Sequence, residues 1–227
     1  MMTMERSKLV MAALIRFGLG MIVVPLMLIL PAGTIYYWHA WVYCAILFTP
    51  MIFAVAYFIR TDPELLERRL RAREKEKAQV WIMLFSSIFI LAAFLLPGFD
   101  FRFGWSKAPL WLVILSDVMV LLGYLGFVAV LRFNSYAGRT IEVDKGQKVI
   151  TTGPYALVRH PLYLAYSLII IFTPLALGSY WALPFFLTAV PFLVLRILNE
   201  EAVLRRDLAG YTEYCQKTKY HLIPFVW

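Results

Sequence analysis

The chain has few charged residues and only two cysteines, and both shortages limit the classes of protein to which it can belong. Asp, Glu, Lys and Arg make up only 16% of the 227 residues, whereas a soluble domain carries about a quarter. The two cysteines, Cys44 and Cys215, lie in different segments without a partner spacing. The sequence therefore supports neither a disulfide framework nor a metal site.

The chain is instead rich in apolar residues. Hydrophobic residues make up 62% of it and the mean hydropathy is +0.73, which is typical of an integral membrane protein. The net charge of +8 could suggest nucleic acid, but the basic residues lie between apolar runs. Membrane topology and contact with anionic lipid explain them better, so we expect no nucleic-acid partner.

The apolar runs predict an all-α membrane protein with about six transmembrane helices. Four runs cover residues 10–30, 36–59, 80–96 and 109–131, and the first is expected to stop at Pro31. Two shorter runs, 162–177 and 183–198, are interpreted as a C-terminal helical hairpin kinked by Pro174, Pro184 and Pro191. Arg16 interrupts the first run, and we expect it to snorkel to the nearer interface.

The stretch 60–79 is the most charged part of the chain. Asp62-Pro63-Glu64 predicts a helix start, and Leu65, Leu66 and Leu70 can share one face of a short interfacial amphipathic helix. Glu64–Arg68 and Glu67–Arg71 are attractive pairs four residues apart. We favour a solvated topogenic loop as the role of this stretch, with a substrate gate as the alternative.

The distribution of basic residues predicts the topology. The stretch 60–79 is much richer in Lys and Arg than the linker 97–108, so we place it in the cytoplasm. The polar segment 132–160, the tail 199–227 and both termini then also lie on the cytoplasmic side. We divide the chain into N-terminal transmembrane helices, 1–132, and a C-terminal region with the polar loop, the hairpin and the tail, 133–227.

Two polar patches flank the predicted hairpin, and its closure would bring them together. In the second patch, Arg196 and Glu200 lie four apart on one helix face. Arg196 lies on the apolar side of this boundary, where a charge is costly unless it is paired. Either the two form a structural pair, or Arg196 anchors an anionic substrate while Glu200 holds it or a cofactor.

In the first patch, His160 and Tyr163 lie three apart at a helix start marked by Pro161, and their rings could wall a polar pocket. At these residues the chain resembles the isoprenylcysteine carboxyl methyltransferase family and, more broadly, membrane methyltransferases that include phospholipid N-methyltransferases. The resemblance covers residues 143–227. Its motifs are, in order, Gly153-Pro154-Tyr155, Arg159-His160-Pro161-Leu162-Tyr163, Arg196-Ile197-Leu198-Asn199-Glu200-Glu201, Gly210-Tyr211-Thr212-Glu213-Tyr214 and Leu222-Ile223-Pro224.

The resemblance implies S-adenosyl-L-methionine bound at the cytoplasmic face, under a lid formed by the tail. The strand-like piece 147–150 matches a stretch that gives backbone contacts in the family, and Glu142 stands where the family often has Gln. Ala165 stands where Gly is common, which could narrow helix packing or a lipid-side tunnel. Tyr211, Tyr214 and His221 could line the adenosine pocket or serve as lid packing. The implied cofactor contacts are Glu142, Gln147, Lys148, Val149, Ile150, Tyr155, His160, Pro161, Leu162, Tyr163 and Glu200.

We therefore predict a membrane methyltransferase in which Arg196 and Glu200 are catalytic and Arg196 binds the substrate. A carboxylate acceptor, as in a prenylated cysteine, is already a nucleophile, whereas an amine or thiol would need a base such as Glu200 or His160. Phospholipid or thiol methylation, an NADPH-dependent sterol-type reductase and a non-enzymatic small transporter are the alternatives. We expect membrane lipids as partners, a lipophilic or prenylated substrate, and a location in a bacterial inner membrane. The acceptor and the oligomeric state stay open.

Overall fold

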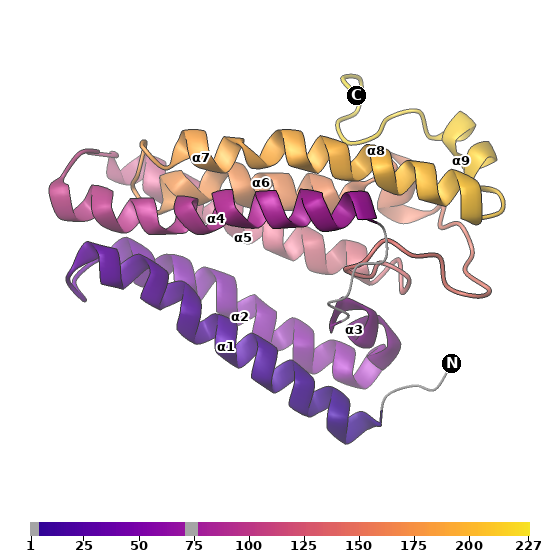
Figure 1. The fold of residues 1–227 in the computed structure, drawn as a ribbon, viewed down its shortest axis with the longest axis horizontal. Coiled ribbons are helices and arrows are strands. Elements are labelled where there is room, and N and C mark those ends of the chain that lie inside the picture. Colours follow the sequence, from indigo (N-terminus) through magenta and orange to yellow (C-terminus); the bar gives the residue numbers. More distant parts are fainter. Residues whose placement is uncertain (1–4, 71–76) are drawn as a thin grey trace.

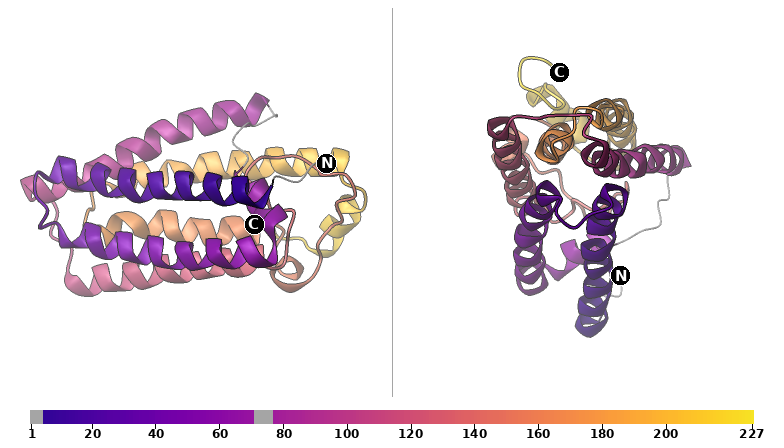
Figure 2. Two further views of the ribbon diagram at one scale, coloured as in Figure 1. Left: turned by 90° about the horizontal axis from the view of Figure 1, so that it is seen from below. Right: turned by 90° about the vertical axis from the view of Figure 1, so that its left-hand side faces the viewer.

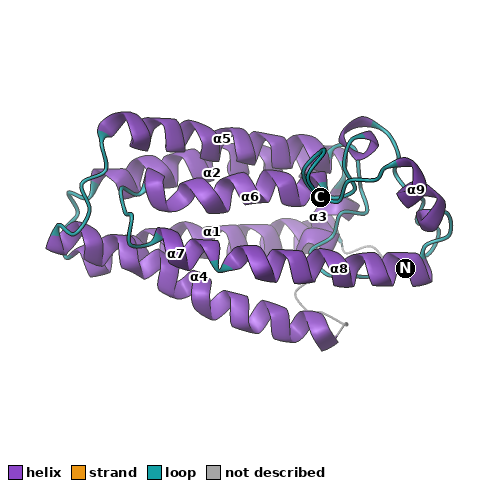
Figure 3. Cartoon of the chain, turned by 90° about the horizontal axis from the view of Figure 1, so that it is seen from above, coloured by secondary structure: helices purple, strands orange, loops and turns teal. Residues whose placement is uncertain are grey.

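A computed structural model describes residues 5–70 and 77–227, and every regular element in these two ranges is helical (Figure 3), as predicted. The long helices run along the length of an elongated bundle (Figure 1). In chain order the elements are α1 (Arg6–Ala32), α2 (Trp38–Thr61), α3 (Pro63–Leu70), α4 (Lys77–Phe103), α5 (Leu110–Leu131), the 3-10 turn η1 (Gly153–Ala156), α6 (Pro161–Ala176), α7 (Leu183–Leu187), α8 (Ala189–Asp207) and α9 (Tyr211–Lys217).

Five helical stretches are long and apolar enough to cross a membrane. They are α1, α2, Met83–Phe103 of α4, α5, and Leu183–Asp207, which α7 and α8 form together. The apolar helix α6 has 16 residues and is shorter than these. These helices indicate an integral membrane protein, while the count of about six crossings stays a prediction.

Two expected helix boundaries and one expected strand-like piece are wrong. Helix α1 continues through Pro31 to Ala32, and α4 continues through Pro97 to Phe103, where a linker was expected. Helices in a bundle tolerate proline where neighbouring helices support the backbone. Helix α1 gives this support to α4 next to Pro97. The two helices pack so closely at Gly98 that an added Cβ would lie 2.4 Å from the Leu28 carbonyl oxygen. The strand-like piece 147–150 forms no strand.

The contact between α5 and α6 is close because small residues face each other. A Cβ on Gly123 of α5 would lie 3.0 Å from the carbonyl oxygen of Ala165 on α6. Ala165 is itself buried, and it lies 3.7 Å from the place of a Cβ on Gly126. Its methyl group therefore acts on helix packing, as small residues do between membrane helices.

One end of the bundle carries a polar network. The buried carboxylate of Asp100 accepts hydrogen bonds from the Ser106 backbone N–H at 2.7 Å, the Ser106 hydroxyl at 2.6 Å and the Ser179 hydroxyl. The Tyr37 hydroxyl donates to the Leu177 carbonyl at 2.6 Å. These bonds join the loops between α1 and α2, α4 and α5, and α6 and α7.

The opposite end of the bundle gathers α3, α9, the loop between α5 and α6, and the C-terminal tail (Figure 1). Helix α1 also begins at this end. The chain turns at Gly178 after α6, so α7 and α8 lead back toward it. Residues at the start of α6 and near the end of α8 thus lie at the same end of the bundle. The placement of this end in the cytoplasm stays a prediction.

Helix α3 packs against the bundle with the predicted face. Asp62 accepts a hydrogen bond from the Leu65 N–H at 3.0 Å as an N-cap, and Leu65, Leu66 and Leu70 are buried. Arg16 donates a hydrogen bond to the Leu70 carbonyl and so joins α1 to α3, while its position at a membrane interface stays a prediction. The predicted pair Glu67–Arg71 includes a residue outside the described ranges.

Candidate functional site

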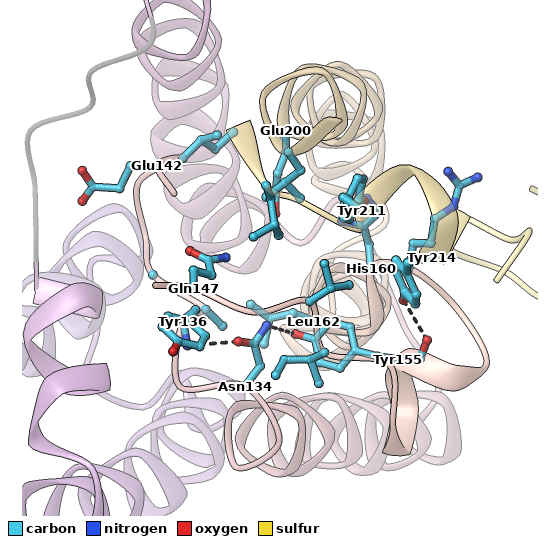
Figure 4. Close-up of a pocket in the computed structure, with 18 of the residues that line it drawn as sticks. Asn134, Tyr136, Glu142, Gln147, Tyr155, His160, Leu162, Glu200, Tyr211 and Tyr214 are labelled. Atoms are coloured by element: carbon cyan, nitrogen blue, oxygen red, sulfur yellow. Dashed lines mark hydrogen bonds between the residues drawn. The ribbon is translucent and has the colours of Figure 1, made fainter. Parts of the chain in front are cut away.

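A polar pocket opens at the end of the bundle that carries α3 and α9 (Figure 4). Its walls come from the loop between α5 and α6, the start of α6, the end of α8, and α9. Pro161 is the one predicted cofactor contact that does not line it, because its buried ring forms the first turn of α6. The other predicted site residues all line it: Glu142, Gln147, Lys148, Val149, Ile150, Tyr155, His160, Leu162, Tyr163, Arg196 and Glu200.

The Tyr163 hydroxyl links the two predicted catalytic residues. It donates a hydrogen bond to Glu200 Oε2 at 2.5 Å and accepts one from Arg196 Nε at 2.9 Å. Arg196 also donates through Nη2 to the Arg139 carbonyl at 2.6 Å. The sequence spacing suggested a direct relation between Arg196 and Glu200, and the structure adds a tyrosine that holds both side chains in place.

Glu201, which the sequence analysis did not single out, is the centre of a buried ionic cluster. Its carboxylate lies 2.9 Å from Arg159 Nη1, 3.2 Å from His160 Nε2 and 2.9 Å from His221 Nδ1. Arg205 Nη2, one helical turn further along α8, lies 3.2 Å away. We call these five residues the Glu201 cluster. Adjacent helical residues point in different directions, so of two consecutive glutamates only one could face the polar pocket.

The Glu201 cluster holds the C-terminal tail. Arg159 donates through Nη2 to the Lys219 carbonyl at 2.8 Å, and its backbone N–H donates to the Tyr220 carbonyl at 2.9 Å. His160 donates its backbone N–H to the His221 carbonyl, also at 2.9 Å. His221 stacks on Trp227 with ring centroids 4.6 Å apart and does not line the pocket. It therefore belongs to the tail packing, the second of its two expected roles.

Burial lowers the pKa of His221 below its ordinary value, because the charged imidazolium loses solvation. Arg159 and His160 lower this pKa further by repulsion, while Glu201 opposes the shift. The neutral form of His221 is therefore favoured in the folded tail.

Three tyrosines form an uncharged aromatic wall of the pocket. Tyr155 accepts a hydrogen bond from Asn134 Nδ2 at 3.0 Å, and its burial raises the pKa of the phenol to about 12. The Tyr214 hydroxyl donates to the Tyr155 carbonyl at 2.7 Å. The buried Tyr211 hydroxyl has no hydrogen-bond partner among the described residues, so it can bond to a ligand.

An apolar hollow of about 400 Å³ adjoins the polar pocket. Its walls include Met83 and Ile90 of α4 and Phe192 of α8, and α4 diverges from the other helices toward its N-terminal end (Figure 2). Tyr163 and Arg196 line both spaces, so they stand at the boundary between them. Within the described ranges, no group of three or more His, Cys, Asp or Glu residues could hold a metal ion.

Comparison with known proteins points to one family. Residues 112–206 match the model of the isoprenylcysteine carboxyl methyltransferase family, which confirms the resemblance seen in the motifs. The matched segment runs from α5 nearly to the end of α8, so the tail motifs at 210–214 and 222–224 lie outside it. The matched segment covers less than half of the chain.

A second comparison relates the chain to a reductase. Over 97 residues it is 32% identical to a Delta(14)-sterol reductase of Mus musculus. The aligned part is 41% of this chain and 23% of that protein. The chain thus spans less than a quarter of the reductase.

Proposed function

We propose that this chain, whose segment 112–206 matches the isoprenylcysteine carboxyl methyltransferase family, transfers a methyl group from S-adenosylmethionine to a lipophilic acceptor. The proposal rests on the boundary between the polar pocket and the apolar hollow. Tyr163 and Arg196 line both the polar pocket and the apolar hollow. A water-soluble donor and a lipid-soluble acceptor could therefore meet there.

The polar pocket fits the proposed cofactor. The aromatic wall of Tyr155, Tyr211 and Tyr214 suits a flat base, and the Tyr211 hydroxyl is available for hydrogen bonding. Glu142 and Glu200 supply negative charge for a cationic ligand, which aromatic faces also favour. S-adenosylmethionine, when bound, supplies a methyl group already activated on a positively charged sulfur.

The residues at the boundary align the reactants and exclude water, which are the contributions that an activated donor leaves to the protein. Arg196 orients an anionic acceptor through its planar guanidinium. Tyr163 fixes Arg196 and Glu200 relative to each other through its two hydrogen bonds. The Tyr163 hydroxyl therefore sets the position of the acceptor relative to the donor.

The contacts of the candidate bases favour an acceptor that is already anionic. His160 Nε2 faces Glu201 in the buried cluster, and Glu200 already accepts the Tyr163 hydroxyl proton in a hydrogen bond. A carboxylate acceptor needs no base, since its oxygen lone pair attacks the methyl carbon while the carbon–sulfur pair stays on sulfur. We therefore favour a carboxylate such as that of an isoprenylcysteine over an amine or thiol.

Calorimetric titration with S-adenosylhomocysteine tests the cofactor site. Glu200→Gln and Tyr211→Phe should each weaken binding, Glu200→Gln by about tenfold or more, because a hydrogen bond to a charged group is worth about 1.5–3 kcal/mol. Asp207→Asn is the control, since Asp207 pairs with Arg206 outside the pocket. Equal affinity in all four proteins would remove the assignment. Radiolabelled methyl transfer into membrane lipids and a prenylcysteine panel is the separate measurement that identifies the acceptor.

The identity to a sterol reductase supports a second candidate, NADPH-dependent reduction. A 2′-phosphate needs free Arg or Lys in the pocket. Arg159 is held by Glu201 and the Lys219 carbonyl, whereas Lys148 is exposed at the pocket wall. Thermal shift separates the candidates: stabilisation by NADPH and not by S-adenosylhomocysteine would support the reductase.

A further inference from the structure

Three arginines from separate parts of the chain line the apolar hollow. Arg69 comes from α3, Arg139 from the loop between α5 and α6, and Arg196 from α8. Arg69 lies outside the segment that matches the methyltransferase family. The remaining lining is mainly hydrophobic, so these cations stand at one side of a space that suits an alkyl chain.

The loop between α5 and α6 positions all three arginines. Arg69 Nη1 donates to the Gly138 carbonyl at 3.0 Å, and Arg196 Nη2 donates to the next carbonyl, that of Arg139, at 2.6 Å. The Arg139 backbone N–H donates to the Arg68 carbonyl at 3.4 Å. Two guanidinium groups are thus anchored on consecutive peptide units, and the third belongs to the same loop.

No acidic side chain in the described part of the protein neutralises the positive charge of Arg69 or Arg139. Neither side chain forms an ion pair with an acidic residue of the ranges 5–70 and 77–227. Arg69 instead lies over the Phe127 ring, 5.0 Å from its centroid. Burial lowers the pKa of Arg69, and the nearby charges of Arg196 and Arg139 lower it further. Arginine stays charged under such conditions, so the repulsion favours binding of an anion.

We propose that the apolar hollow binds an amphiphile whose headgroup carries more negative charge than a single carboxylate, with Arg69 and Arg139 as anchors beside Arg196. This inference deepens the proposed function, on which it rests, by giving the acceptor a second anionic group, such as a phosphate, beside its carboxylate. The alkyl part of the ligand packs between α4 and α8, and the headgroup lies against the loop at residues 138–139.

The test measures binding of decyl phosphate, decanoate and decanol to the full chain in nanodiscs near neutral pH. The phosphate monoester carries about 1.5 to 2 negative charges, whereas decanoate carries one. We expect decyl phosphate to bind about tenfold more tightly than decanoate, and decanol to bind weakest. Equal affinity for decyl phosphate and decanoate, or for the anions and decanol, would overturn the inference.

Variants locate the anion. Arg69→Gln and Arg139→Gln should each weaken decyl phosphate binding by about tenfold and leave decanol binding unchanged. Arg69→Lys, which keeps the charge but loses the planar fork, should fall between Arg69→Gln and the wild type, so the inference stays testable if Arg69→Gln misfolds. Arg132→Gln is the control, because Arg132 lies over the Tyr57 ring outside the hollow. Unchanged phosphate binding in Arg139→Gln and Arg69→Lys contradicts the inference.

The two proposals fail in different ways. Loss of the phosphate preference with normal binding of S-adenosylhomocysteine overturns the anion site and leaves methyl transfer standing. A retained phosphate preference without any binding of S-adenosylhomocysteine overturns methyl transfer and supports an anion site in the hollow.

Discussion

Replacing Glu201 with glutamine should release the C-terminal tail. The side chains of Glu201 and Arg159 are each 6% exposed, and the Glu201 carboxylate faces Arg159. Removing one partner of a buried ion pair costs about 3–5 kcal/mol, because the other charge is left uncompensated. Arg205 adds little to this figure because its side chain is 43% exposed.

The cost converts to a measurable change in tail opening. Since about 1.4 kcal/mol corresponds to tenfold in an equilibrium constant, a loss of about 3 kcal/mol raises the open fraction of the tail about a hundredfold. Hydrogen exchange of residues 218–227 reports this opening directly, and trypsin cleavage at Lys217 and Lys219 gives an independent readout.

Glu200→Gln is the matched control for Glu201→Gln. The two residues are neighbours on α8, but Glu200 bonds to Tyr163 and lines the polar pocket, whereas Glu201 faces the tail. Glu200→Gln should weaken S-adenosylhomocysteine binding and leave tail exchange unchanged. Unaltered exchange at residues 218–227 in Glu201→Gln would refute the assignment of Glu201 as the residue that holds the tail.

Two further predictions concern pH and packing. Because the folded-state pKa of His221 is depressed, the unfolded chain binds more protons than the folded chain below about pH 6.5. Protection of the tail from hydrogen exchange should therefore decrease as the pH falls through that value. His221→Gln should flatten this pH profile, and an unchanged profile contradicts the reasoning. Gly123→Val should destabilise the contact of α5 with α6 by about 1–3 kcal/mol in thermal unfolding, since its Cβ meets Ala165 at 3.0 Å. Gly126→Ala, whose Cβ would make an ordinary 3.7 Å contact, is the control, and equal melting temperatures for the two variants would exclude this packing.

The sequence by itself determined the class of fold and many of the residues that line the polar pocket. Long apolar runs with few charges predict membrane helices, because the backbone must satisfy its own hydrogen bonds in the bilayer. The polar patches on either side of the last apolar runs had to meet once the chain turned at Gly178, so all but one of the predicted site residues line one pocket. Helix ends were less well determined, because proline stops a helix only where no neighbour supports it, as α1 supports α4 at Gly98.

Only the tertiary structure decided which charged side chains meet. Glu200 and Glu201 are neighbouring glutamates that the sequence pattern does not distinguish. The turn of the helix points Glu200 into the pocket and Glu201 at Arg159, which holds the tail. The sequence offered no sign that Tyr163 would stand between Arg196 and Glu200, or that Arg69 would approach Arg196 across more than a hundred residues. Such partners depend on how distant helices pack, and packing depends on the whole bundle, not on the local pattern.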